Sequence, residues 1–169
     1  MKQLALLLGI VLSFEGHAQS LAVNASEDRP GLKIVELAAK GTEETNEFGS
    51  KADWVRIENT GNSTIRLSSY KIYITDDVNS LTKFRLEKKN IDPNGSIIIW
   101  CDDLDVIRDQ IHTNFKLSSK GETISLTIQR GSQIEIIDQV TYEEVGDDTQ
   151  KTLLRSGSNI LEYRTAESL

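Results

Sequence analysis

Residues 54–58 read Trp-Val-Arg-Ile-Glu (WVRIE), and this stretch decides the fold class. Apolar and charged side chains alternate in it, so that Val55 and Ile57 face one side of an extended chain and the charged side chains face the other. A period of two residues is typical of a half-buried β-strand. The turn-forming residues 60–63 (TGNS) follow directly and end the strand.

The same pattern recurs on both sides of this stretch. Residues 92–95 (DPNG) form the strongest turn signal in the chain, because proline presets φ and Asn-Gly tolerates positive φ. Residues 103–110 are the only stretch that could form a helical turn. Several short strands with no long helical pattern predict an all-β sandwich or barrel. The expected strands are residues 33–38, 54–58, 65–67, 70–75, 84–86, 96–101, 123–129 and 134–142.

Longer motifs resemble a known family. Residues 52–61 (ADWVRIENTG) are similar to a strand of lamin-tail domains, in which acidic, aromatic and alternating aliphatic residues precede an asparagine. The resemblance spans residues 32–155 and is closest to the exported bacterial branch. It implies an immunoglobulin-like β-sandwich, used in nuclear lamins as an interaction module and in exported bacterial proteins often as an accessory domain beside an enzyme. Further matching motifs are residues 67–77, 91–100, 112–118, 121–126 and 138–140.

The N-terminus has the pattern of a secretory signal. Lys2 supplies the positive charge, residues 4–14 form the apolar region, and cleavage is expected after Ala18. The apolar run is too short for a permanent transmembrane anchor. We therefore expect a signal peptide at residues 1–18, a disordered leader at 19–31, the lamin-tail-like sandwich at 32–155 and a C-terminal tail at 156–169. The protein is predicted to be secreted, periplasmic or on the cell surface.

Charge and cysteine content limit the partners. The formal net charge is −7 and the sequence pI is near 4.9, which argues against nucleic acid, because its binding depends on lysine and arginine. Cys101 is the single cysteine, so no intrachain disulfide is expected. The expected partner is an unidentified protein or glycan.

Two residues could form a nucleophilic pair, Cys101 and His112, since a thiolate needs a nearby base or positive charge. Cys101 ends an apolar run, where a cysteine behaves as a small hydrophobe. His112 is expected to order the loop before Phe115 through a hydrogen bond. No enzyme and no catalytic residue are therefore predicted.

Acidic pairs after strands suggest a possible metal site. Calcium prefers such oxygen ligands, although neither stretch fits the known calcium-loop template. Solvated turns account for the same residues. No cofactor is required, calcium is possible, and a calcium-stabilised carbohydrate-binding module of the cell envelope is the alternative function. The candidate ligands are Asp76, Asp77 and Asn79 in one loop and Asp102, Asp103 and Asp105 in the other.

Aromatic and basic side chains provide other candidate contacts. Trp54 and Tyr73 are the candidates for an exposed ligand-binding aromatic, although Trp54 also fits the core, where Trp100 is expected. Glu122 is expected to accept backbone N–H bonds in a turn. A cationic stretch could contact an acidic partner, or it could be a charged edge strand that deters edge-to-edge pairing. Its cations are Lys83, Arg85, Lys88 and Lys89.

Overall fold

The computed structural model describes residues 29–40, 43–146, 152–156 and 160–164. The predicted signal peptide and residues 19–28 of the predicted leader lie outside the described residues. Within the ranges described, no helix has the length and apolar character needed to cross a membrane. The elements are β1 (Leu32–Ala38), β2 (Asp53–Asn59), β3 (Ile65–Arg66), η1 (Leu67–Ser69), β4 (Ile72–Thr75), β5 (Phe84–Leu86), β6 (Asn90–Ile91), β7 (Ser96–Cys101), β8 (Val106–Ile107), β9 (Ile111–His112), β10 (Gly121–Arg130), β11 (Gln133–Glu143), β12 (Thr152–Ser156) and β13 (Ile160–Arg164).

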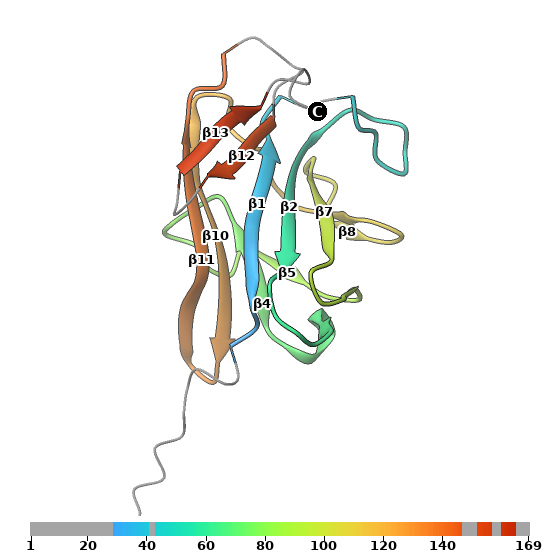
Figure 1. Ribbon diagram of the computed structural model, residues 1–169, viewed down its shortest axis with the longest axis vertical. Coiled ribbons are helices and arrows are strands. Elements are labelled where there is room, and N and C mark those ends of the chain that lie inside the picture. The colour runs from blue at the N-terminus through green and yellow to red at the C-terminus, as the bar shows by residue number, and fades with distance from the viewer. Residues whose placement is uncertain (1–28, 41–42, 147–151, 157–159, 165–169) are drawn as a thin grey trace, which may run out of the picture.

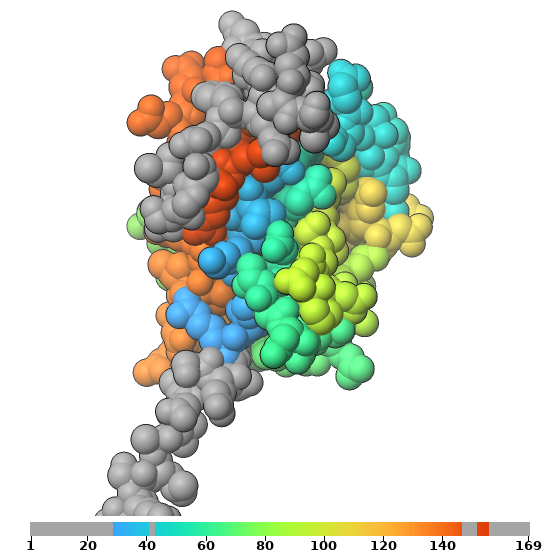
Figure 2. All heavy atoms as spheres, in the orientation of Figure 1, coloured from blue at the N-terminus to red at the C-terminus, as the bar shows by residue number. Residues whose placement is uncertain are grey.

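The strands form a sandwich of two layers (Figure 1). One layer has the order β1-β2-β7-β9-β8, and the other has the order β5-β4-β10-β11. The β12–β13 hairpin joins them, because β12 pairs with β1 and β13 pairs with β11. Strands β12, β1 and β2 lie side by side on one face (Figure 2). The all-β sandwich predicted from the sequence is confirmed.

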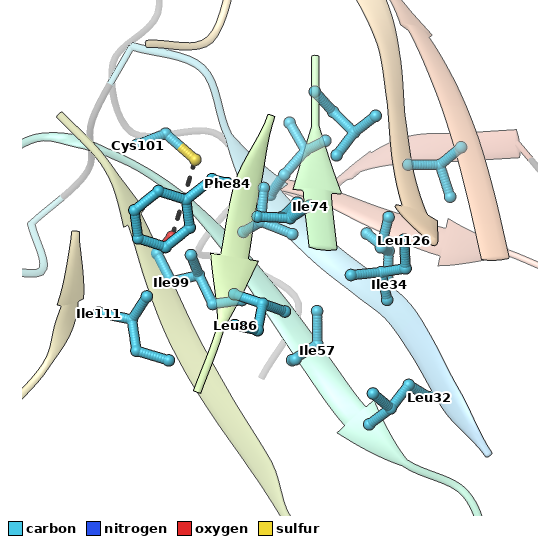
Figure 3. Close-up of a cluster of buried hydrophobic side chains, with 14 of the residues drawn as sticks. Leu32, Ile34, Ile57, Ile74, Phe84, Leu86, Ile99, Cys101, Ile111 and Leu126 are labelled. Carbon is cyan, nitrogen blue, oxygen red and sulfur yellow. Dashed lines mark hydrogen bonds between the residues drawn. The ribbon is translucent and has the colours of Figure 1, made fainter. Parts of the chain in front are cut away.

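The main core lies between the two layers, where the alternation seen in the sequence turns aliphatic side chains inward (Figure 3). Residues from β1, β2 and β7 meet residues from β4, β5 and β10. Each fully buried side chain of this kind contributes about 1.5–3 kcal/mol to folding. The central members, all 0% exposed, are Ile34, Ile57, Ile99, Ile74, Leu86 and Leu126.

A second, smaller cluster lies on the outer face of β1, β2 and β7. The register places Ala38 opposite Trp54 and Trp54 opposite Trp100. These three side chains pack together, and both indole side chains are 1% exposed or less. The same row continues into β9, where Trp100 is the partner of His112. The outer face of this layer is therefore partly apolar and buried.

Residues 103–110 do not form the helical turn that the sequence allowed. Asp103 and Asp105 both have positive φ, of 64° and 53°, which interrupts any right-handed helix. Val106 and Ile107 form β8 instead and pair with β9. The β-branched pair thus extends the sheet rather than a helix.

One carboxylate links strands of both layers where β1 has an irregularity between Ile34 and Glu36. Asp138 Oδ2 accepts hydrogen bonds from Ile34 N at 2.7 Å and from Arg155 Nη1 at 2.6 Å. Arg155 also donates to the Ile34 carbonyl at 3.1 Å. The sheet extends past Arg155, because β13 occupies part of the region predicted as a C-terminal tail. The tail prediction is wrong for that part.

Candidate binding groove

The two reactive side chains do not meet. Cys101 lies in the main core, with Sγ 3.9 Å from the Ile99 carbonyl (Figure 3). Burial raises the pKa of its thiol well above the usual value, and this opposes thiolate formation. The imidazole of His112 instead directs Nδ1 to Asp102 Oδ2 at 2.7 Å. The geometry supports packing for Cys101, not nucleophilic attack.

His112 contacts Asp102 and the loop at residues 46–48 rather than the segment before Phe115. The prediction that it orders the segment before Phe115 is therefore wrong. Its ring is 0% exposed, and Nε2 lies 3.4 Å from Glu47 Oε1. Phe48 packs on the ring with centroids 5.0 Å apart. Asn46 Nδ2 donates to Asp102 Oδ2 at 3.1 Å. These contacts fasten residues 46–48 over the outer face of β7 and β9.

The first acidic loop is occupied by local interactions. Asp76 Oδ1 pairs with Lys83 Nζ at 2.6 Å, and Asp77 Oδ1 accepts from Asn79 N at 2.8 Å. The second bond is the local turn contact that aspartate commonly makes. The structure therefore gives Asp76 and Asp77 separate structural roles within the turn.

The second acidic loop is divided in the same way. Asp102 belongs to the His112 cluster, while Asp103 and Asp105 are exposed at positive-φ positions. Across the described residues, no three His, Cys, Asp or Glu side chains come together as metal ligands. Asp147 and Asp148, a third acidic pair, lie outside the described residues. Calcium binding by these loops stays a prediction.

The aromatic candidates separate. Trp54 is 0% exposed, which contradicts a surface binding role. Its alternation did place it on the outer face, but Ala38, Trp100 and the guanidinium of Arg56, 5.3 Å from the ring centre, cover it there. Tyr73 is half-buried, and its hydroxyl donates to Gln129 Oε1 at 3.1 Å. A ligand contact by Tyr73 stays a prediction.

Glu122 has the predicted turn role. Its Oε1 accepts from Ser118 N at 2.7 Å and from the Tyr142 hydroxyl at 2.9 Å. Burial raises the pKa of the Glu122 carboxyl, and the hydrogen bonds from Ser118 and Tyr142 oppose that rise. The pKa of Tyr142 is raised as well, by burial first and by the nearby Glu122 carboxylate second. The pair closes the turn that leads into β10.

A groove opens between the two ends of the folded sheet. Strand β5 ends one layer and β8 ends the other, since each is the terminal strand in the sheet order (Figure 1). The space between them has a volume of about 420 Å³. It is lined by Lys83, Phe84, Arg85, Glu87, Lys88, Asp105, Val106 and Ile107.

Hydrogen bonds connect the two walls of the groove. Asn114 Nδ2 donates to the Lys83 carbonyl at 3.3 Å, just before β5. Lys89 Nζ, beyond β5, donates to the Asp109 carbonyl in the turn after β8. These two contacts join residues flanking β5 to residues that follow β8 and β9.

The charges of the groove are unevenly distributed. Lys83 is already used, by Asp76 and by the ring of Phe115, 5.1 Å away. Arg85 and Lys88 are exposed on the β5 wall, and the nearest carboxylate oxygen of Glu87 is 3.9 Å from Arg85 Nε. Asp105 is on the opposite wall. One wall is therefore cationic in a protein of net charge −7.

The sequence indicates only the β5 wall of the groove. The cationic stretch of residues 83–89 was visible as an edge strand or an acidic-partner contact. Nothing in the sequence indicates that Val106 and Ile107 form the other wall, because β5 and β8 are far apart along the chain and do not pair by hydrogen bonds. Only the folding of the layers brings them together.

The sequence profile of the lamin tail domain family matches residues 25–144. This chain belongs to the lamin tail domain family. Lamin tail domains are immunoglobulin-like domains that are not themselves catalytic, which confirms the predicted family and the immunoglobulin-like fold. No curated protein matches the chain. In this lamin tail domain, β12 and β13 extend the sheet beyond the last matched residue.

Proposed function

We propose that this lamin tail domain is an exported, non-catalytic interaction module that binds a protein of the cell envelope in the groove between β5 and β8. The observation that carries the proposal is a groove with one cationic wall and two half-buried aliphatic side chains, Val106 and Ile107, on the other. Family membership supports an interaction role in general. Export rests on the signal pattern of residues 1–18.

A protein fits the groove better than a glycan does. Sugar rings stack well on exposed aromatic faces, whereas the aromatic ring in this lining, that of Phe84, belongs to a residue only 6% exposed. Half-buried Val106 and Ile107 offer apolar contact instead. Apolar contact with a charged rim is characteristic of protein interfaces.

The test uses the full chain expressed with its own N-terminus in a bacterial host. The exported product is expected to begin at Gln19, as measured by mass spectrometry. Immobilised product is then incubated with detergent extract of its own cell envelope. We expect one retained protein, and we expect Arg85→Glu/Lys88→Glu to abolish its retention.

The matched control is Lys33→Glu/Lys120→Glu, which changes the net charge equally at exposed positions outside the groove lining. Equal loss in both variants would indicate a general charge effect and contradict groove binding. Retention that survives the groove variant would place the interface elsewhere. No retention at all would contradict stable envelope binding.

A further inference from the structure

The edge of β5 has an alternating arrangement that a further strand can extend. Within the described residues β5 pairs with β4 on one side only. Phe84 and Leu86 are 6% and 0% exposed and face the core, whereas Arg85 faces outward. A terminal strand of a sheet presents backbone N–H and C=O groups that another strand can pair with.

A strand added beside β5 would repeat this alternation. The residue opposite Arg85 would face outward, and its two neighbours would face into the groove. On that inner side lie the half-buried side chains of Val106 and Ile107. The inward residues of an added strand therefore need to be aliphatic.

The charges of the groove determine which side chain is favoured at the outward-facing position of the added strand. Arg85 favours an acidic side chain opposite it, because opposite charges on neighbouring strands attract, and Lys88 adds positive charge beyond the end of β5. Asp105 on the far wall repels an acidic side chain and directs it toward β5. A second copy paired antiparallel about Arg85 would oppose like charges, so the edge disfavours self-pairing.

We propose that the groove binds an extended segment of its partner protein as a strand added to β5, with an acidic residue opposite Arg85 and aliphatic residues on either side of it. This inference rests on the proposed function and specifies its ligand. The added strand has a defined end, since Lys88 has a φ of 63° and turns the chain away from the line of β5. The recognised segment is consequently short.

The probe is a short capped peptide that alternates valine and glutamate. Binding is followed by backbone amide shifts of the isotope-labelled protein. Shifts are expected at residues 84–86 and 106–107, with weakening at high salt. Arg85→Glu/Lys88→Glu is expected to weaken the Kd by about ten-fold or more, while Lys33→Glu/Lys120→Glu leaves it unchanged.

Two altered peptides separate the possible causes. A valine–lysine peptide keeps the strand propensity but reverses the charge, and it is expected not to bind. A valine–glutamate peptide N-methylated on every amide keeps the charge but cannot donate a backbone hydrogen bond on either edge. Equal binding of either peptide would overturn the proposal.

The result is separable from that of the envelope test. Groove-dependent retention of an envelope protein without any peptide binding would leave the interaction role standing and reject strand addition. Peptide shifts at β5 with the expected charge dependence would support strand addition even if envelope extract yields no partner. If neither retention of an envelope protein nor peptide binding is observed, the groove is rejected as a binding site.

Discussion

At the scale of single residues, Asp138 connects parts of the chain that lie far apart in sequence. Its carboxylate satisfies the backbone N–H of Ile34 at the irregularity of β1 and pairs with Arg155 of β12. The side chains of Asp138 and Arg155 are each 11% exposed. A nearly buried pair of this kind tolerates loss of one partner poorly, because the other charge is left desolvated.

Asp138→Ala is therefore expected to lower the free energy of unfolding by about 3 kcal/mol, measured by urea denaturation. The double variant Asp138→Ala/Arg155→Met is expected to lose less than the sum of the two single variants. Strict additivity would show that the two side chains do not stabilise the fold as a pair.

Glu122 gives a pH-dependent prediction. Its raised pKa means that the folded state holds the proton more tightly than the unfolded chain, whose reference pKa is 4.5. That contribution to stability is complete below pH 4.5 and is lost as the pH rises through the folded-state pKa.

Glu122→Gln keeps an oxygen that can accept from Ser118 N and the Tyr142 hydroxyl but carries no charge. The variant is expected to equal the native chain at low pH and to exceed it at neutral pH by about 1 kcal/mol or less, because the half-buried carboxyl remains partly solvated. Unfolding curves from acid to neutral pH measure the difference. A difference that does not change with pH would contradict the assignment, with Glu135→Gln on the exposed part of β11 as the matched control.

Residue-level features were predictable where they depended on neighbours in sequence. The turn role of Glu122 followed from the glycine before it and the strand after it. The burial of Trp54 did not, because alternation assigns a side chain to a face but does not reveal what covers that face. Its cover comes largely from Trp100, its cross-strand partner in β7.

At the scale of elements, the central strands were predictable and the last strands of the sheet were not. Strands β2, β7 and β10 have long apolar alternation or apolar runs, which fix their type. Strand β8 has two residues and is defined only by pairing with β9. The groove wall formed by β8 was missed for this reason, whereas the cations of the β5 wall were already recognised.

At the scale of the whole molecule, the β12–β13 hairpin completes the sheet between the two layers. The family match ends at residue 144, before either strand begins. Leu153 on β12 is 3% exposed, and Arg155 belongs to the buried pair with Asp138. The structural domain is thus larger than the part that the family profile matches.

A chain that ends at Glu144 is expected to lose stability, because β1 loses a hydrogen-bonded neighbour and Asp138 loses its cation. We expect the Tm to fall by about 10 °C or more in thermal unfolding, with increased association on size-exclusion chromatography from the exposed edge of β1. A chain that ends at Arg164 is the matched control. An unchanged Tm on ending at Glu144 would show that the hairpin is dispensable.

The pairing of β1 with β12 also has a consequence for the order of folding. Glu36 and Leu154 are register partners although they lie far apart along the chain. Closing such a large loop costs conformational entropy before the contact yields any stabilisation. A ribosome or translocation channel delivers β1 early and β12 late. Until β12 emerges, the edge of β1 that pairs with β12 has no hydrogen-bonded neighbour. Such a nascent chain would benefit from a holding chaperone until its last strands emerge.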